Sequence, residues 1–163
     1  MRAIVASAAV LVPAARAQTT ANRGPVNDSL FAADAAAGGL AQLSFSGIGL
    51  PKATDPGPRT FSQQMIDVHA RLNQELTTLA AQKQIALPRP LDARARFCGE
   101  GLGGVPREDF DRCYAKARLA AHREAVAAFE AKAERGQGSR IKALAAEALP
   151  VLKMYLKMIS RSP

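Results

Sequence analysis

The sequence predicts an all-α protein that folds as an antiparallel four-helix bundle, with a long crossover between the second and third helices. Four long segments place apolar side chains at helical spacing, so that each segment can bury one face. Short links join the first segment to the second and the third to the fourth, whereas residues 84–105 separate the two pairs. The chain has only two histidines, His69 and His122, and each lies in the apolar stripe of a different segment. We therefore expect both imidazoles to point into the bundle.

Residues 1–17 have the pattern of an export signal. Arg2 supplies a positive charge, an apolar run follows, and a small-x-small cleavage site ends at Ala17. The apolar run is too short to cross a bilayer, and no later run approaches the roughly 18 to 20 apolar residues that a membrane-spanning helix needs. We expect an exported protein, periplasmic or secreted, whose mature chain has no transmembrane segment. Residues 18–26 are polar with Gly and Pro, which predicts a flexible leader.

The rest of the chain, residues 27–160, has the size of one domain with a single core. The formal net charge is +8 and becomes +6 once Arg2 and Arg16 are removed with the export signal, so the exported protein could adhere to anionic envelope components. The basic residues are nevertheless scattered, which is also typical of solvated helix faces. Aromatic residues make up 5% of the chain and none interleave with basic clusters, which argues against a nucleic-acid partner.

The first predicted helix covers residues 28–52. Asn27 or Asp28 can cap its N-terminus, and apolar side chains recur at helical spacing from Phe31 to Leu50. Four glycines weaken this helix, because a glycine in a helix interior costs up to about 1 kcal/mol relative to alanine. The helix therefore needs tertiary support or close packing against a neighbour.

The second predicted helix covers residues 56–83. Asp55 followed by Pro56 is a helix start signal, and apolar residues follow at helical spacing as far as Leu79. A Pro-x-Pro sequence that begins at Pro88 prevents the helix from continuing.

The third and fourth predicted helices cover residues 106–135 and 139–160. The third starts near Pro106, and a Gly-Gln-Gly sequence ends it. The fourth contains Pro150, which removes a backbone hydrogen bond and is expected to kink the helix.

The crossover, residues 84–105, is long enough to run the length of a bundle about 40 Å tall. It holds a possible short helix at residues 91–97 and a glycine-rich turn at residues 99–104. Two hairpins joined by one such crossover are the connectivity of ferritin-like bundles.

The two cysteines, Cys98 and Cys113, suit an oxidising compartment and predict a disulfide. A bridge that closes a loop of about fifteen residues would contribute about 3 kcal/mol. Cys113 is half a helical rotation from His122, so it should face away from the core, and the bridge would fasten the crossover to the outside of the third helix. Two free thiols are the alternative.

Several stretches together resemble a family of exported bacterial proteins of unknown function, commonly labelled predicted outer membrane proteins and assigned a ferritin-like bundle. The resemblance covers about residues 28–160. The matching stretches are residues 35–43 (AAAGGLAQL), residues 61–69 (FSQQMIDVH) with Asn73 and Leu76, Leu87-Pro88, Phe110-Asp111 with Tyr114, His122 with Val126 and Phe129, and Leu149-Pro150 with Leu152.

Three positions depart from the pattern of that family, and two of them are potential ligand positions. Gln42 stands where the family usually has an acidic residue, and Tyr155 stands where it usually has a histidine. Val68 occupies the place of a common aspartate. These departures weaken the case for a site that demands a strict set of ligands.

A ferritin-like di-iron centre is not predicted. Such a centre needs about four carboxylates and two Glu-x-x-His pairs, but Ile66 and Leu119 stand three residues before His69 and His122.

A simpler site remains possible in the same place. A single zinc, copper or iron ion could use His69 and His122, with Tyr155 or Gln42 completing the shell. The alternative is a core without a cofactor, in which these four polar side chains hydrogen-bond to one another and fix the alignment of the helices.

Catalytic signatures are missing from the sequence. The glycines of residues 99–104 match a dinucleotide fingerprint only in their letters, and no serine or cysteine lies in a nucleophile motif. The arginines of the third helix are expected to solvate its outer faces; they are Arg107, Arg112, Arg118 and Arg123.

The sequence thus indicates a non-enzymatic, exported cell-envelope bundle that acts as a binding or stress-related module. The alternative is a metal-binding or redox ferritin-like protein that uses His69 and His122.

Overall fold

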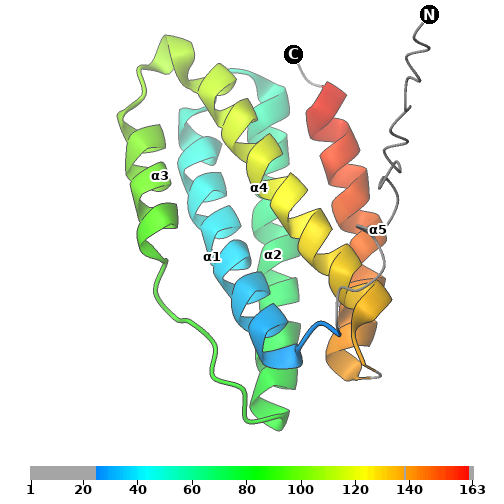
Figure 1. Cartoon of the computed structure of the whole chain (residues 1–163). Coiled ribbons are helices and arrows are strands. Elements are labelled where there is room, and N and C mark those ends of the chain that lie inside the picture. Colours follow the sequence, from blue (N-terminus) through cyan, green and yellow to red (C-terminus); the bar gives the residue numbers. More distant parts are fainter. Residues whose placement is uncertain (1–24, 138, 162–163) are drawn as a thin grey trace, which may run out of the picture.

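The computed structural model describes residues 25–137 and 139–161, and within these ranges the protein is helical, with a single isolated β-bridge. Figure 1 shows the helices of this part of the chain running alternately up and down. Their bounds are α1 Asp28–Lys52, α2 Pro56–Gln82, α3 Ala93–Gly104, α4 Arg107–Arg135 and α5 Arg140–Arg161. The four long helices therefore differ from the expected bounds by no more than one residue at either end.

The fold has a fifth helix that the sequence did not predict in full. We expected a short helix at residues 91–97 and a glycine-rich turn at residues 99–104, but α3 begins at Ala93 and continues through the expected turn to Gly104. Asp92 caps it by accepting a hydrogen bond of 2.7 Å from the backbone amide of Ala95. Gly99 lies against Ser44 and Ile48 of α1, so tertiary packing outweighs the low helix propensity of the glycines.

The four long helices pack against one another, and α3 lies on the outer side of α1 (Figure 1). The connection from α2 to α4 contains α3 and runs the length of the bundle, as the crossover prediction required. The α5 helix continues through Pro150. None of the described helices is long and apolar enough to cross a membrane.

The core consists of three apolar clusters. Each is built around aromatic side chains, which are Phe31 and Phe129 in the first, Phe45, Phe110 and Tyr114 in the second, and Phe61 and Tyr155 in the third. Polar side chains are also buried among these clusters, and they are Gln42, Ser46, Ser62, His69, Arg118, His122 and Lys132. Because several polar side chains are buried, the core is partly polar.

Two glycines of α1 allow neighbouring helices to approach closely. A Cβ atom on Gly49 would lie 2.4 Å from the ring of Tyr114 in α4, and one on Gly39 would lie 2.0 Å from the side-chain oxygen of Asn73 in α2. The glycines that appeared to weaken the predicted first helix therefore serve close packing.

The end of the predicted leader is fixed to the bundle. Val26 forms a parallel β-bridge with Gly136, and its carbonyl accepts a hydrogen bond of 2.8 Å from Lys132. The Lys132 ammonium is fully buried and also lies 2.5 Å from Asp28, which bonds to Ser139 and Lys83 as well. This N-terminal clamp holds the start of α1 against the α4–α5 turn. Residues 1–24, which include the expected export signal, lie outside the described residues.

Both cysteines are free in the structure, so the bridge between Cys98 and Cys113 stays a prediction. Cys98 is exposed on α3. The expectation that Cys113 faces away from the core is wrong, because it is half-buried against the cluster that contains Phe110 and Tyr114.

Gly47 and Gly49 provide a matched test of the close approach of α1 and α4. A Cβ on Gly47 meets nothing within 4 Å, so Gly47→Ala should stabilise the protein by up to about 1 kcal/mol through helix propensity. Gly49→Ala should destabilise it by about 2 kcal/mol, because the buried Tyr114 ring has no room to move. Urea unfolding measures both values, and a stabilising Gly49→Ala would contradict the assigned role.

The N-terminal clamp can be tested by a double-mutant cycle. Asp28→Ala should cost about 3 kcal/mol in unfolding free energy, because it leaves the buried Lys132 ammonium without its carboxylate. The same change made in a Lys132→Met background should cost far less. Equal costs in the two backgrounds, measured by urea unfolding, would show that the pair is not coupled.

Candidate functional site

The structure brings the two histidines together in the middle of the bundle. The ring centroids of His69 in α2 and His122 in α4 are 6.1 Å apart, with the ring planes at 83°. The side chains are 3% and 0% exposed, so both imidazoles point into the core as the apolar stripes predicted. Residues far apart in the sequence thus form one buried imidazole pair.

Gln42 joins this pair from α1. Its amide nitrogen lies 3.0 Å from Nδ1 of His122, which also lies 3.2 Å from the carbonyl oxygen of Arg118. A ring nitrogen carries either a proton or a lone pair, so Nδ1 either accepts from Gln42 or donates to Arg118. In both tautomers the other nitrogen of His122, Nε2, has no hydrogen-bond partner among the described residues.

Tyr155, the fourth candidate, is buried but packs differently. Its ring contacts Phe61 at 5.9 Å between centroids, and Phe61 in turn contacts His122 at 5.6 Å. Among the described residues no hydrogen bond joins Tyr155 to either histidine. The structure therefore groups Gln42 with the histidines and places Tyr155 in the adjacent apolar cluster.

Several buried polar atoms near the imidazole pair have no hydrogen-bond partner within the described residues. They are both ring nitrogens of His69, Nε2 of His122, both side-chain polar atoms of Asn73 and Nε of Arg118. Each such atom costs about 1 to 3 kcal/mol if nothing satisfies it. Asn73 was not a candidate, although it follows His69 by four residues and so shares its face of α2. These atoms mark the centre of the bundle as a place that can take up hydrogen-bonding groups.

The expectation that Arg118 solvates an outer face of α4 is wrong. Arg107, Arg112 and Arg123 are exposed as predicted, but Arg118 is only 3% exposed. Its guanidinium stacks between two aromatic rings, 4.3 Å from the centroid of Phe61 and 4.9 Å from that of Tyr114. A signal was present in the sequence, because residues 114, 118 and 122 recur at the spacing of one helix face.

Burial keeps both histidines uncharged at neutral pH. Desolvation, aided by the neighbouring His122, lowers the pKa of His69 from 6.5 to about 4. Desolvation also lowers the pKa of His122 to about 4. The hydrogen bond to the backbone carbonyl of Arg118 raises this pKa, and the positive charge of the Arg118 side chain lowers it. Each ring therefore offers one donor and one acceptor at neutral pH.

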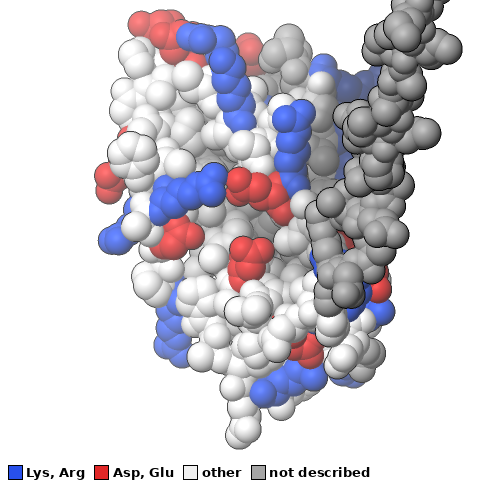
Figure 2. Space-filling model, in the orientation of Figure 1, with Lys and Arg blue, Asp and Glu red and all other residues white. Residues whose placement is uncertain are grey.

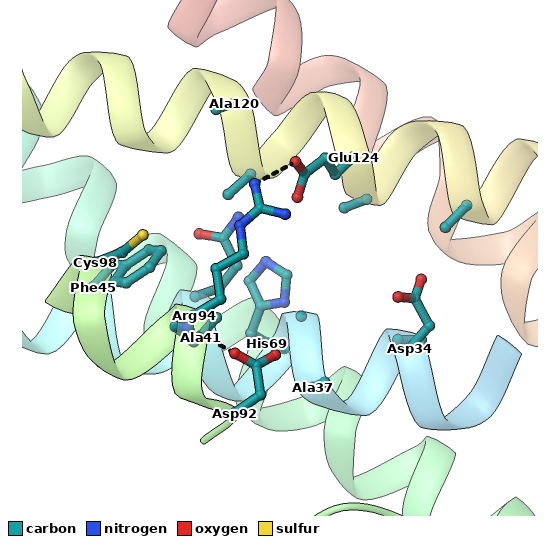
Figure 3. Close-up of a pocket in the computed structure, with 18 of the residues that line it drawn as sticks. Asp34, Ala37, Ala41, Phe45, His69, Asp92, Arg94, Cys98, Ala120 and Glu124 are labelled. Carbon is teal, nitrogen blue, oxygen red and sulfur yellow. Dashed lines mark hydrogen bonds and ion pairs between the residues drawn. The ribbon is translucent and has the colours of Figure 1, made fainter. Parts of the chain in front are cut away.

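A cavity of about 290 Å³ opens beside His69 (Figure 3). It lies between α1 and α4, with α3 along one side and His69 of α2 at its base. Most of its wall is made of alanine and glycine, for example Gly38 of α1 and Ala121 of α4. An ion pair of 3.1 Å between Arg94 of α3 and Glu124 of α4 crosses its edge.

The side chains around the imidazole pair that could bind a metal ion are mostly uncharged. Within the described residues, no three His, Cys, Asp or Glu side chains gather as a metal-binding group. An ion here would depend on the two imidazoles and on amide oxygens such as those of Gln42 and Asn73. The buried charge of Arg118, which already acts on His122, would oppose a divalent cation.

The buried histidines predict that stability depends on pH. Below pH 6.5 the histidines are protonated in the unfolded chain, whereas in the folded chain they stay neutral until about pH 4. The contribution of the histidines to the free energy of unfolding should therefore be constant above pH 6.5 and fall as the pH decreases below it. At pH 5 the loss should be about 2 kcal/mol for each histidine. Urea unfolding between pH 7 and pH 5 measures this loss before most carboxylates titrate. The variant with His69→Gln and His122→Gln serves as the control, and a wild-type slope in that variant would exclude the histidines as the cause.

Comparisons with known proteins identify the family and the fold. No functionally curated protein matches the sequence. The crystal structure of a DUF305 fragment from Deinococcus radiodurans is similar, with a TM-score of 0.71 and 12% sequence identity over 85% of this chain and 96% of that chain. At this identity the likeness shows a shared fold. The model of DUF4142, a domain of unknown function, matches residues 12–161, and the chain therefore belongs to the DUF4142 family.

Proposed function

We propose that this protein is a non-enzymatic binding module of the cell envelope, and that it holds a small ligand in the cavity beside His69. One observation carries the proposal. His69 is buried and uncharged, neither of its ring nitrogens has a partner among the described residues, and its side chain lines a cavity of about 290 Å³. A ligand that bonds to His69 would satisfy groups that otherwise destabilise the fold.

The size and lining of the cavity agree with a binding site. Ligand pockets are mostly apolar, with a few polar groups that fix orientation, and range from about 300 to 1,000 Å³. This cavity lies near the lower limit, and its polar groups include His69 and Gln42. It therefore suits a small ligand.

Export is the second part of the proposal. The pattern of residues 1–17 supports an export signal, and the pair Cys98 and Cys113 supports an oxidising compartment such as the periplasm. Contact with anionic envelope components is supported by the net charge of the chain without its export signal, which is +6 because Arg2 and Arg16 are lost from the total of +8. Figure 2 shows acidic and basic side chains interspersed on the visible face, so such contact would rely on overall charge.

A metal-binding role is the second candidate, and the spacing of the histidines favours it. An ion bound by one nitrogen of each ring, with bonds of about 2 Å, would place the ring centroids about 5 to 6.5 Å apart. The observed separation is 6.1 Å. The up-and-down bundle with one crossover also supports a ferritin-like fold. Zinc, copper or iron is compatible with imidazole ligands.

The two candidates are separated by different measurements on the mature protein. For the binding module, NMR titration with toluene, a neutral probe smaller than the cavity, should show saturable shifts around Ala121 and Leu72. Ala121→Leu fills the cavity and should weaken binding at least tenfold. Ala127→Leu, on the exposed side of α4, should leave it unchanged. Absence of saturable binding, or equal binding by both variants, would overturn the cavity proposal.

The metal-binding role requires metal analysis of protein purified from its native compartment. Stoichiometric metal that is lost when both histidines are changed to alanine would establish the second candidate. Metal-free protein that still binds the probe would support the first.

A further inference from the structure

The charged groups that line the cavity offer little to a charged ligand. Arg94 and Glu124 are paired with each other, and their side chains are 79% and 65% exposed. Asp92 already accepts a hydrogen bond from the backbone of α3, and the exposed Asp34 lies away from His69 in Figure 3. A charged ligand would therefore lose its hydration without gaining a buried partner of opposite charge.

The buried end of the cavity is polar but neutral. The His69 side chain lines this end, and its buried ring nitrogens lack a partner among the described residues, whereas Gln42 is already engaged with His122. A neutral imidazole has one nitrogen that accepts a hydrogen bond and one that donates. The group best matched to it is a neutral hydroxyl, because a hydroxyl can donate to the first nitrogen or accept from the second.

The walls between this end and the opening cannot form hydrogen bonds through their side chains. They consist largely of methyl groups from α4, such as those of Ala117, Ala121 and Ala125, opposite the small residues of α1. Leu72 and Phe129 add larger apolar surface. The body of a bound molecule must therefore be apolar. A cavity of about 290 Å³ has room for about ten water-sized groups, which limits the ligand to about ten non-hydrogen atoms.

We propose that the ligand of this cavity is an uncharged molecule of at most about ten non-hydrogen atoms, with an apolar body and one hydroxyl group that bonds to His69, phenol being a simple member of the class. This inference rests on the proposed function, because it names the ligand class of the same site. It assigns the apolar body to the alanine-lined walls and the hydroxyl to the histidine. His69 is then the residue that determines specificity.

The test compares probes of similar size on the mature protein by NMR titration or calorimetry. Phenol and toluene differ in one polar group, and benzoate and benzylamine carry opposite charges. Phenol should bind at least tenfold more tightly than toluene, and the two charged probes should bind more weakly than toluene. In a His69→Leu variant the advantage of phenol over toluene should disappear while toluene binding persists. Ala127→Leu, on the exposed side of α4 and outside the cavity, should leave the preference for phenol unchanged.

The outcomes separate this inference from the proposed function. If toluene and phenol bind equally, or if benzoate binds best, the ligand class is wrong while the cavity remains a binding site. If the advantage of phenol survives His69→Leu, His69 is not the recognition residue, and the inference fails. If no probe binds and Ala121→Leu behaves as wild type, both proposals fail. Circular dichroism of each variant checks that the helices are intact.

Discussion

The small side chains of α1 set the geometry on which the rest of the structure depends. This helix contacts each of the other described helices, and its glycines allow Asn73 of α2 and Tyr114 of α4 to lie directly against its backbone. Close approach at Gly39 and Gly49 brings three helices near one another around the bundle axis. Elsewhere the small residues of α1 and α4 do not fill the space between them, and the cavity beside His69 results. The same composition therefore produces both tight contacts and a hollow.

A polar core follows from this arrangement and has an electrostatic cost. His69 and His122 avoid most of that cost by remaining uncharged, since burial lowers the pKa of each to about 4. Arg118 keeps its charge, stacked between the rings of Phe61 and Tyr114. The surroundings of the imidazole pair therefore combine neutral hydrogen-bonding groups with the buried charge of Arg118, a combination that suits neutral ligands better than divalent cations. This is the physical basis for preferring a small organic ligand to a metal ion.

Under the proposed function, specificity would come from the shape and the polarity of the cavity. The described residues of the cavity supply an apolar wall and a neutral polar base, and its charged groups are at the exposed edge. Such a site recognises size, polarity and the position of one hydrogen-bonding group. Membership in DUF4142 establishes kinship, and the DUF305 fragment establishes a shared fold, but the inference of ligand binding depends on the chemistry of His69 and its surroundings.

The sequence alone determined the all-helical class, the long helices and the inward orientation of His69 and His122, because helical periodicity, caps and prolines are local signals. It did not determine the continuity of α3, since packing on α1 outweighs four unfavourable glycines. The spacing of residues 114, 118 and 122 placed Arg118 on the face of His122, but only the tertiary structure supplied the Phe61 ring that covers its charge and the carboxylate of Asp28 that pairs with the buried Lys132. The cavity was also decided by the tertiary structure. Its volume depends on how closely helices that are distant in the sequence approach one another, and no local sequence pattern predicts this distance.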